Sequence, residues 1–260
     1  MVSRCPQYGF GSIPRPLIDQ LRRTLIAMEK VIYLLWRDTQ TPRETFARQL
    51  RCEVAAQLQA LGAQRLQLNL ADSDVDAAAG LRQENNRPLP HACLSLWLDS
   101  ANASARQPFD RLIMAATARM AAYLVCESEA IGNTRFACAP GERTYGFAQV
   151  ALLTRPPRLT PQAWLDIWRN HHTAVAIDTQ DNFQYVQNLV VQVLTHGAPP
   201  IDAIVEECFP PAAMTDPQAF FDAVGDEAKF QRNLAIMMDS CARFIDFDKI
   251  DVLPTSQYRL

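Results

Sequence analysis

The sequence predicts an α+β fold in which two tandem βαββαβ repeats close into one barrel. The order strand, helix, strand, strand, helix, strand occurs twice along the 260 residues, and both first helices follow a Thr-Pro pair. Thr is a favoured N-cap and Pro suits the first helical position, so each pair marks a helix start. Each four-stranded sheet would expose one apolar face, and packing the two faces together buries both.

The first repeat is expected to begin with a buried strand and to contain two helices. Its first helix runs from Thr41-Pro42 to about Leu61, and its second begins near Phe109. Its strands are short apolar runs at residues 30–37, 65–70, 91–98 and 123–129.

The second repeat follows the same plan. Its helices begin at Thr160-Pro161 and near Asp226, and its strands are expected at residues 148–155, 183–193, 201–209 and 244–252. A segment rich in Gly, Pro, Thr and Arg separates the repeats and is typical of a linker. The chain therefore divides into an N-terminal extension that can fold over the repeats, the first repeat, the linker and the second repeat, at residues 1–27, 28–130, 131–146 and 147–260.

Composition excludes several classes of function. The net charge is −3 and Lys and Arg are scattered, which argues against nucleic acid or an anionic membrane as a partner. The seven cysteines form no Cys-x-x-Cys pair and favour reduced thiols, hence a cytoplasmic protein. No run approaches the roughly 18 apolar residues of a membrane span. The Gly-rich nucleotide motifs and Gly-x-Ser-x-Gly do not occur.

The first helix of the second repeat carries the most informative pattern. Trp164, Trp168 and His172 are spaced i, i+4, i+8 and so share one helix face. An imidazole beside desolvating aromatic rings is a candidate general acid or base, and Tyr185 on the next strand is a candidate proton donor or oxyanion partner. His171 is the reserve candidate, because a register error of one residue is common. The alternative is a core histidine that bonds a carbonyl or caps a helix.

Two carboxylates form a second candidate pair. Alternation along the closing strands places Glu127 and Asp248 at equivalent positions facing the barrel interior. In a partly apolar cavity such a pair would have raised pKa values. The alternative is that both are solvated acids at strand ends. The adjacent histidines diverge by about 100°, and no His-x-x-x-His spacing occurs, so no metal site is expected.

The second repeat resembles the EthD-like family of the dimeric α/β-barrel superfamily, whose repeats are ferredoxin-like. The residues that carry the resemblance are Arg155, Trp164, Trp168, His172, Tyr185, Gln187 and Asn188. In the first repeat, aligning the Thr-Pro pairs places Gln49 opposite Trp168 and Glu53 opposite His172, so the site there is expected to be lost. Activity is therefore expected in the second repeat alone.

The resemblance implies a small catalyst or binder of hydrophobic ligands, in a family often labelled oxidoreductase. We expect a cofactor-independent enzyme for proton transfer, decarboxylation, dehydration or oxidation, with His172 as acid/base helped by Tyr185, His171 or Asp248. The substrate-binding residues are expected to be Arg155, Trp164, Trp168, Gln187, Asn188 and Glu127. A non-catalytic binding or interaction barrel is the alternative, and haem ligation is a minor one. Because one chain completes the barrel, a monomer or weak homodimer is expected.

Overall fold

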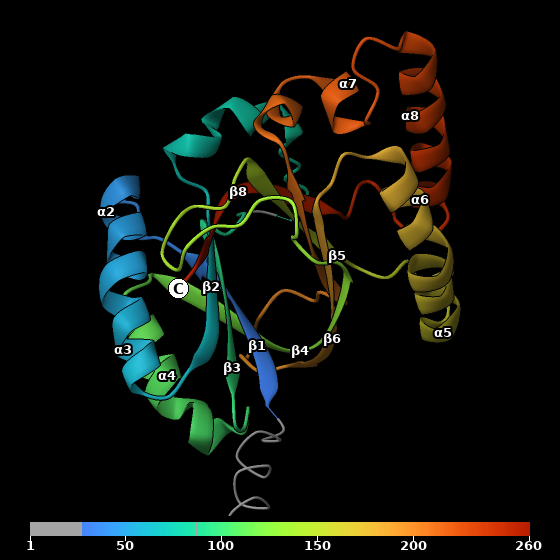
Figure 1. Ribbon diagram of the computed structural model, residues 1–260. Coiled ribbons are helices and arrows are strands. Elements are labelled where there is room, and N and C mark those ends of the chain that lie inside the picture. Colours follow the sequence, from blue (N-terminus) through green and yellow to red (C-terminus); the bar gives the residue numbers. More distant parts are fainter. Residues whose placement is uncertain (1–27, 87) are drawn as a thin grey trace, which may run out of the picture.

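Eight strands close into one antiparallel barrel in the order β1-β3-β2-β8-β5-β7-β6-β4 (Figure 1). The structure is a computed structural model and describes residues 28–86 and 88–260, so the N-terminal extension expected at 1–27 lies outside the described residues. The strands are β1 Glu29–Trp36, β2 Gln64–Leu70, β3 Ala92–Leu98, β4 Arg119–Ile131, β5 Phe147–Leu153, β6 Gln184–Val193, β7 Ala203–Phe209 and β8 Asp251–Arg259.

The barrel consists of two ferredoxin-like units, as the sequence predicts. The first unit contributes β4-β1-β3-β2 and the second contributes β6-β7-β5-β8, so each has the strand order of a βαββαβ sheet. The units join where β2 pairs with β8 and where β4 pairs with β6. Closure pairs every strand on both sides and leaves no open sheet edge.

Helices cover the outside of the barrel on opposite sides (Figure 1). The first unit's helices lie on one side, and α5, α6 and α8 of the second unit lie on the other. In each unit the first long helix contains a π-helical stretch, Gln49–Val54 or Asp166–His172. The remaining helices are α2 Arg43–Arg48, α3 Ala55–Ala60, α4 Ala103–Ala115, α5 Pro161–Leu165, α6 Thr173–Thr179, α7 Pro217–Phe220, α8 Glu227–Ala242 and the 3₁₀ segments Ser73–Leu81 and Pro211–Met214.

Apolar side chains fill three places: the barrel lumen and the two spaces between sheet and helices. Ile32, Leu34 and Tyr123 pack inside the lumen. Tyr33, from the same strand as Ile32, faces outwards into the first unit's helical layer. Strands that are buried on both faces give no alternation of polar and apolar residues, which matters for the site below.

The helix starts differ between the two units. Thr160 caps its helix, with its hydroxyl accepting a 3.2 Å hydrogen bond from the Ala163 N–H, as expected. In the first unit the N-cap is Pro42, which makes no side-chain capping bond, so the expected Thr41 cap is wrong. The two helices therefore align one residue differently, since α2 begins at Arg43 where α5 begins at Pro161.

That shift changes which residues replace the tryptophan and histidine of the second unit. Buried Leu50 and Val54, rather than Gln49 and Glu53, occupy the positions of Trp168 and His172. Glu53 is exposed on the outer side of its helix. The first unit has apolar side chains where the second has an indole and an imidazole.

The expected closing strand at 244–252 is wrong. Residues 243–250 form turns after α8, and β8 spans Asp251–Arg259 instead. The run Phe244-Ile245-Asp246-Phe247 mixes apolar and acidic residues as a strand does, but only Phe244 is buried and its neighbours are partly or largely exposed. The expected start near Phe109 is also wrong, because α4 already begins at Ala103.

Candidate functional site

The second unit contains a cavity of about 650 Å³ between the outer face of its sheet and its helices. Its floor is formed by β5, β6 and β7, and its walls by α8 and the turns that follow it. The 3₁₀ segment Ser73–Leu81 and Gln83 of the first unit close one side. The cavity thus lies outside the barrel lumen, against the helices of the second unit.

A small residue on β5 creates this space. Ala151 faces the cavity, and Gln149 lies two positions earlier on the same face. The matching registers β1–β3 and β5–β7 place Tyr33 of the first unit at the position of Ala151. Tyr33 is fully buried and fills the corresponding space in the first unit.

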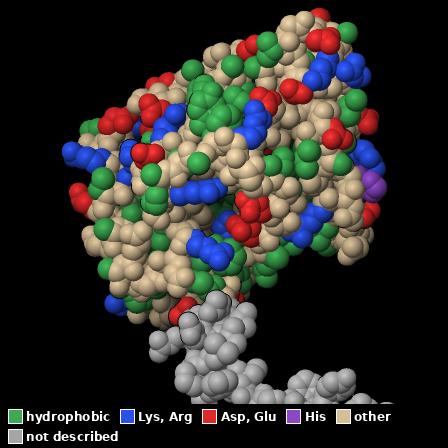
Figure 2. All heavy atoms as spheres, viewed as in Figure 1, with side chains coloured by type: hydrophobic (Ala, Val, Ile, Leu, Met, Phe, Trp, Pro, Cys, Tyr) green, Lys and Arg blue, Asp and Glu red, His purple; other side chains and the backbone are tan. Residues whose placement is uncertain are grey.

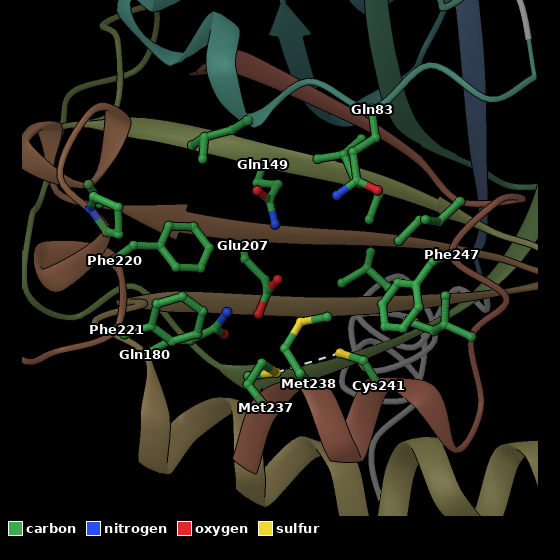
Figure 3. Close-up of a pocket in the computed structure, with 18 of the residues that line it drawn as sticks. Gln83, Gln149, Gln180, Glu207, Phe220, Phe221, Met237, Met238, Cys241 and Phe247 are labelled. Atoms are coloured by element: carbon green, nitrogen blue, oxygen red, sulfur yellow. Dashed lines mark hydrogen bonds between the residues drawn. The ribbon is translucent and has the colours of Figure 1, made fainter. Parts of the chain in front are cut away.

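Glu207 is the carboxyl group on the cavity floor. It lies on β7, paired with Gln149 on β5 and with Tyr185 on β6. Figure 3 shows its side chain reaching into the cavity, near Gln149 and Met238. Asn182 Nδ2 donates a 3.1 Å hydrogen bond to Glu207 Oε1. Burial raises the pKa of Glu207 to about 7 and outweighs the lowering effect of this hydrogen bond. The carboxyl group therefore changes protonation near neutral pH.

His172 lies in the cavity wall, at the C-terminal end of the π-helical stretch. Its Nδ1 is 3.0 Å from Ser240 Oγ on α8, and its ring centroid is 4.6 Å from that of Phe244. Burial lowers the pKa of His172 to about 4, so the imidazole is neutral at pH 7. It can exchange hydrogen bonds with a ligand, but it is a weak base.

Tyr185 and Trp168 complete the floor beside the helix. The Tyr185 hydroxyl accepts a 3.0 Å hydrogen bond from Gln187 Nε2, which also donates to Thr173 Oγ1 at 2.8 Å. Burial raises the pKa of Tyr185, so its phenol stays protonated. Gln187 therefore positions Tyr185 and does not itself line the cavity.

Trp164 supports the cavity from behind. Its indole is 5.1 Å from the ring of Trp168, and its Nε1 donates a 3.0 Å hydrogen bond to the Phe244 carbonyl. This bond ties the turn after α8 to the helix that carries His172. Trp164 is a positioning residue and not a cavity-lining one.

Comparison with known proteins finds a family match in the second unit. Residues 156–248 match the family model of the EthD domain. The second unit contains an EthD domain. No curated protein matches the sequence.

Solved structures similar to this chain include three barrel proteins. An anthrone oxidase-like protein is 8% identical, with 90% of this chain and 91% of that chain covered and a TM-score of 0.49. A protein named as a monooxygenase from Fusobacterium nucleatum is 8% identical, with 89% and 92% covered and a TM-score of 0.46. A chlorite dismutase from Candidatus Nitrospira defluvii is 12% identical, with 91% and 94% covered and a TM-score of 0.42.

Several residues expected in the site lie outside the cavity of the EthD domain. His171 is exposed, with Nε2 3.7 Å from the Asp166 carboxylate, because it is turned away from the face that carries His172. Asp248 is exposed in the turn after α8, so the expectation that it faces the barrel interior is wrong. Arg155 follows β5 and donates to the Leu159 carbonyl.

Glu127 and Asn188 lie in a third place, the barrel lumen. Both bond to Lys30, which donates to the Glu127 carboxylate and, at 2.9 Å, to Asn188 Oδ1. Glu127 thus lines the lumen, which the sheet separates from the cavity of the EthD domain. The seven residues of the resemblance thus divide between the cavity, its support and other parts of the barrel.

Sequence reasoning missed Glu207 and the sulfur-containing wall of α8, formed by Met237, Met238 and Cys241. A usable signal existed, since Glu206 and Glu207 are adjacent acids inside the apolar strand β7. Charged residues are rarely buried without a reason. Periodicity could not show which of the two faces the helices, because every residue of β7 is buried.

Two negative findings apply to the described residues. Within residues 28–86 and 88–260, no three His, Cys, Asp or Glu side chains gather closely enough to hold a metal ion. No helix in the same part of the chain has the length and apolar character needed to cross a membrane. On the face shown in Figure 2, basic and acidic side chains are interspersed.

Proposed function

We propose that the EthD domain is a cofactor-independent enzyme that transfers a proton on a hydrophobic small molecule held in its cavity. The observation that carries the proposal is Glu207, a buried carboxyl group on the floor of a largely apolar cavity, whose pKa is raised to about 7. A general base works best when its pKa is near the working pH, because it is then both available and strong enough.

The walls of the cavity favour a hydrophobic, flat ligand. Phe220, Phe221 and Phe247 contribute aromatic rings, and Met237 and Met238 contribute flexible thioethers that adapt to irregular shapes (Figure 3). Mostly apolar walls with a few polar groups are typical of small-molecule sites, and 650 Å³ is a common volume for one.

Glu207 supplies the proton-transfer group and Gln149 supplies a hydrogen-bond donor beside it. The Gln149 side chain, paired across the sheet from Glu207, forms no hydrogen bond with another described residue. Its amide N–H groups are free to bind a substrate oxygen. His172 takes a supporting role in this proposal, because a neutral imidazole with a pKa of about 4 can donate from Nε2 but removes protons poorly.

The reaction step uses only these groups. The Glu207 carboxylate takes a proton from a carbon next to a substrate carbonyl. The C–H electron pair forms a carbon–carbon double bond, and the π pair of the carbonyl moves to its oxygen. Hydrogen bonds from Gln149 and His172 stabilise the resulting enolate oxygen. In a substrate whose β and γ carbons share a double bond, the enolate is conjugated with that bond, and protonated Glu207 returns the proton to the γ carbon. The double bond moves into conjugation with the re-formed carbonyl, so the product is an isomer and no electrons are gained or lost.

The first experiment is native mass spectrometry of the purified protein, followed by denaturing extraction and identification of the released compound. That compound, together with a panel of aryl ketones, is then incubated with the protein in D₂O, and C–H exchange is followed by proton NMR. We expect exchange with the wild type and a loss of roughly 100-fold or more with Glu207→Gln. Glu53→Gln, an exposed carboxylate of the first unit, is the matched control and should exchange as the wild type does.

The outcomes separate an enzyme from a binding protein. Exchange that survives Glu207→Gln would contradict the assignment of Glu207. Tight binding of the extracted compound without any exchange would favour the non-catalytic alternative. A haem absorption band in the purified protein would contradict the cofactor-independent mechanism.

The assembly and setting follow from the barrel and the thiols. Because both sheets close on each other within one chain, we propose a monomer or weak homodimer, to be measured by light scattering at several concentrations. The cysteines among the described residues are free thiols, which supports a cytoplasmic setting.

A further inference from the structure

The barrel lumen contains a separate cavity of about 360 Å³, at the end where β1 begins and β8 ends. Glu206 lies in this cavity, whereas its neighbour Glu207 lies in the EthD cavity. Successive side chains of a strand point to opposite faces of the sheet, so β7 separates the two carboxyl groups. The proton-transfer reaction makes no use of the lumen cavity.

Three side-chain amide groups donate hydrogen bonds to the Glu206 carboxylate. It is 6% exposed. Its Oε1 accepts from Asn69 Nδ2 at 2.6 Å and from Gln257 Nε2 at 2.7 Å, and its Oε2 accepts from Gln67 Nε2 at 2.7 Å. The Thr144 hydroxyl donates to Gln257 Oε1, which fixes the direction of that amide. A carboxylate, with acceptor positions only, fits this set of donors.

The negative charge of Glu206 has no cation beside it. Among residues 28–86 and 88–260, Glu206 forms no ion pair with Lys, Arg or His. Lys30 is the buried cation of the lumen, and Glu127 neutralises it. Glu206, Lys30 and Glu127 together therefore carry one net negative charge. Arg65 and Arg259 lie at the exposed rim, where water screens them.

Ser95 provides a second polar group for a ligand in this cavity. It is 7% exposed and lines the same cavity, opposite Gln67 across the β2–β3 ladder. Its hydroxyl makes no hydrogen bond to any other described residue. The hydroxyl oxygen is not enclosed by protein atoms, so it is open to a ligand in the cavity. Trp97, two residues further along the same strand, adds an apolar wall.

We propose that the lumen cavity binds a small primary amine in its protonated form. The ammonium group lies between Glu206 Oε2 and the Ser95 hydroxyl, and the short carbon chain lies against Trp97. An ammonium has three N–H donors and no acceptor, which suits a site that offers a carboxylate and a free hydroxyl. Its charge balances Glu206, and a charge-assisted hydrogen bond is stronger than a neutral one.

Calorimetric titration with three probes of equal length tests the proposal. n-Butylammonium, 1-butanol and butyrate are each titrated into the full-length protein at low ionic strength. We expect saturable one-to-one binding of butylammonium and no comparable binding of the other two. Tighter binding of butyrate, which the rim arginines would attract, or no binding of butylammonium would overturn the proposal.

Adjacent residues on β7 provide a matched pair of variants. Glu206→Gln should weaken butylammonium binding roughly tenfold or more, because it removes the charge that the ammonium meets. Glu207→Gln is the same change on the other face of the strand and should leave this binding unchanged. Equal binding by both variants would overturn the proposal.

A second variant keeps the test decisive if Glu206→Gln does not fold. Ser95→Ala removes one hydroxyl without adding bulk and should weaken butylammonium binding several-fold. An affinity equal to that of the wild type would show that the ammonium does not lie beside Ser95. Because Ser95 is remote from the EthD cavity, failure here would not bear on the proposed proton transfer.

Discussion

Replacing Glu207 with Gln should stabilise the protein while abolishing its proposed activity. The carboxyl group is buried, and burial disfavours its charged form. Its pKa is about 7 in the folded protein and near 4.5 in the unfolded chain. At about 1.4 kcal/mol per pKa unit, this difference corresponds to roughly 3 kcal/mol of unfavourable free energy in the folded wild type at high pH.

The sign of the effect depends on pH. Below pH 4.5 the carboxyl group is protonated in both states and contributes no difference. Between pH 4.5 and about 7 the unfolded chain releases the proton while the folded protein keeps it, so wild-type stability falls as pH rises. Above pH 7 both states are ionised and the full cost is present. Glu207→Gln is neutral throughout and avoids this cost.

Urea unfolding at pH 4.5 and at pH 8 measures the difference. The free energy of unfolding of Glu207→Gln should nearly equal that of the wild type at pH 4.5 and exceed it by up to about 3 kcal/mol at pH 8. Glu206→Gln is the control on the opposite face of the sheet. It should lower stability, because three amide donors there lose a charged acceptor. A Glu207→Gln difference that is the same at both pH values would refute the reasoning.

Three other changes test the site and the fold. Ala151→Leu should fill part of the cavity, as Tyr33 fills the corresponding space in the first unit. Retention of the extracted compound should fall about tenfold while the melting temperature changes little. Unchanged retention would show that the ligand binds elsewhere. The pKa of His172 is lowered from 6.5 to about 4, so the wild type loses stability as pH falls between these values. In thermal melts, the melting temperature of His172→Gln should therefore rise relative to that of the wild type over this pH range. A difference that does not change with pH would contradict the burial argument. Gly146 has φ +73°, and a Cβ added there would lie 1.9 Å from the Phe209 carbonyl oxygen. Gly146→Ala should therefore lower the free energy of unfolding by at least about 2 kcal/mol in urea titrations. Stability close to that of the wild type would show that the backbone can move.

The sequence was informative where a signal is local. The cap at Thr160 and the spacing of Trp168 and His172 predicted a helix that carries both residues on one face, and in the structure both line the cavity. Tyr185 also lines the cavity, because the next strand of a βαββαβ unit returns beside the helix. The same reasoning failed at the turn after α8, because its short run of apolar and acidic residues resembles the sequence of a strand.

The sequence alone determined that two βαββαβ units follow one another and that the second resembles an EthD domain, because periodicity, caps and short motifs depend on neighbouring residues. Only the tertiary structure decided which face of each strand meets the helices and which meets the lumen. In β7 every side chain is buried, so no alternation distinguishes the two faces. Barrel closure places Glu206 and Glu207 in separate cavities, and this separation gives two adjacent carboxyl groups different partners and different proposed roles.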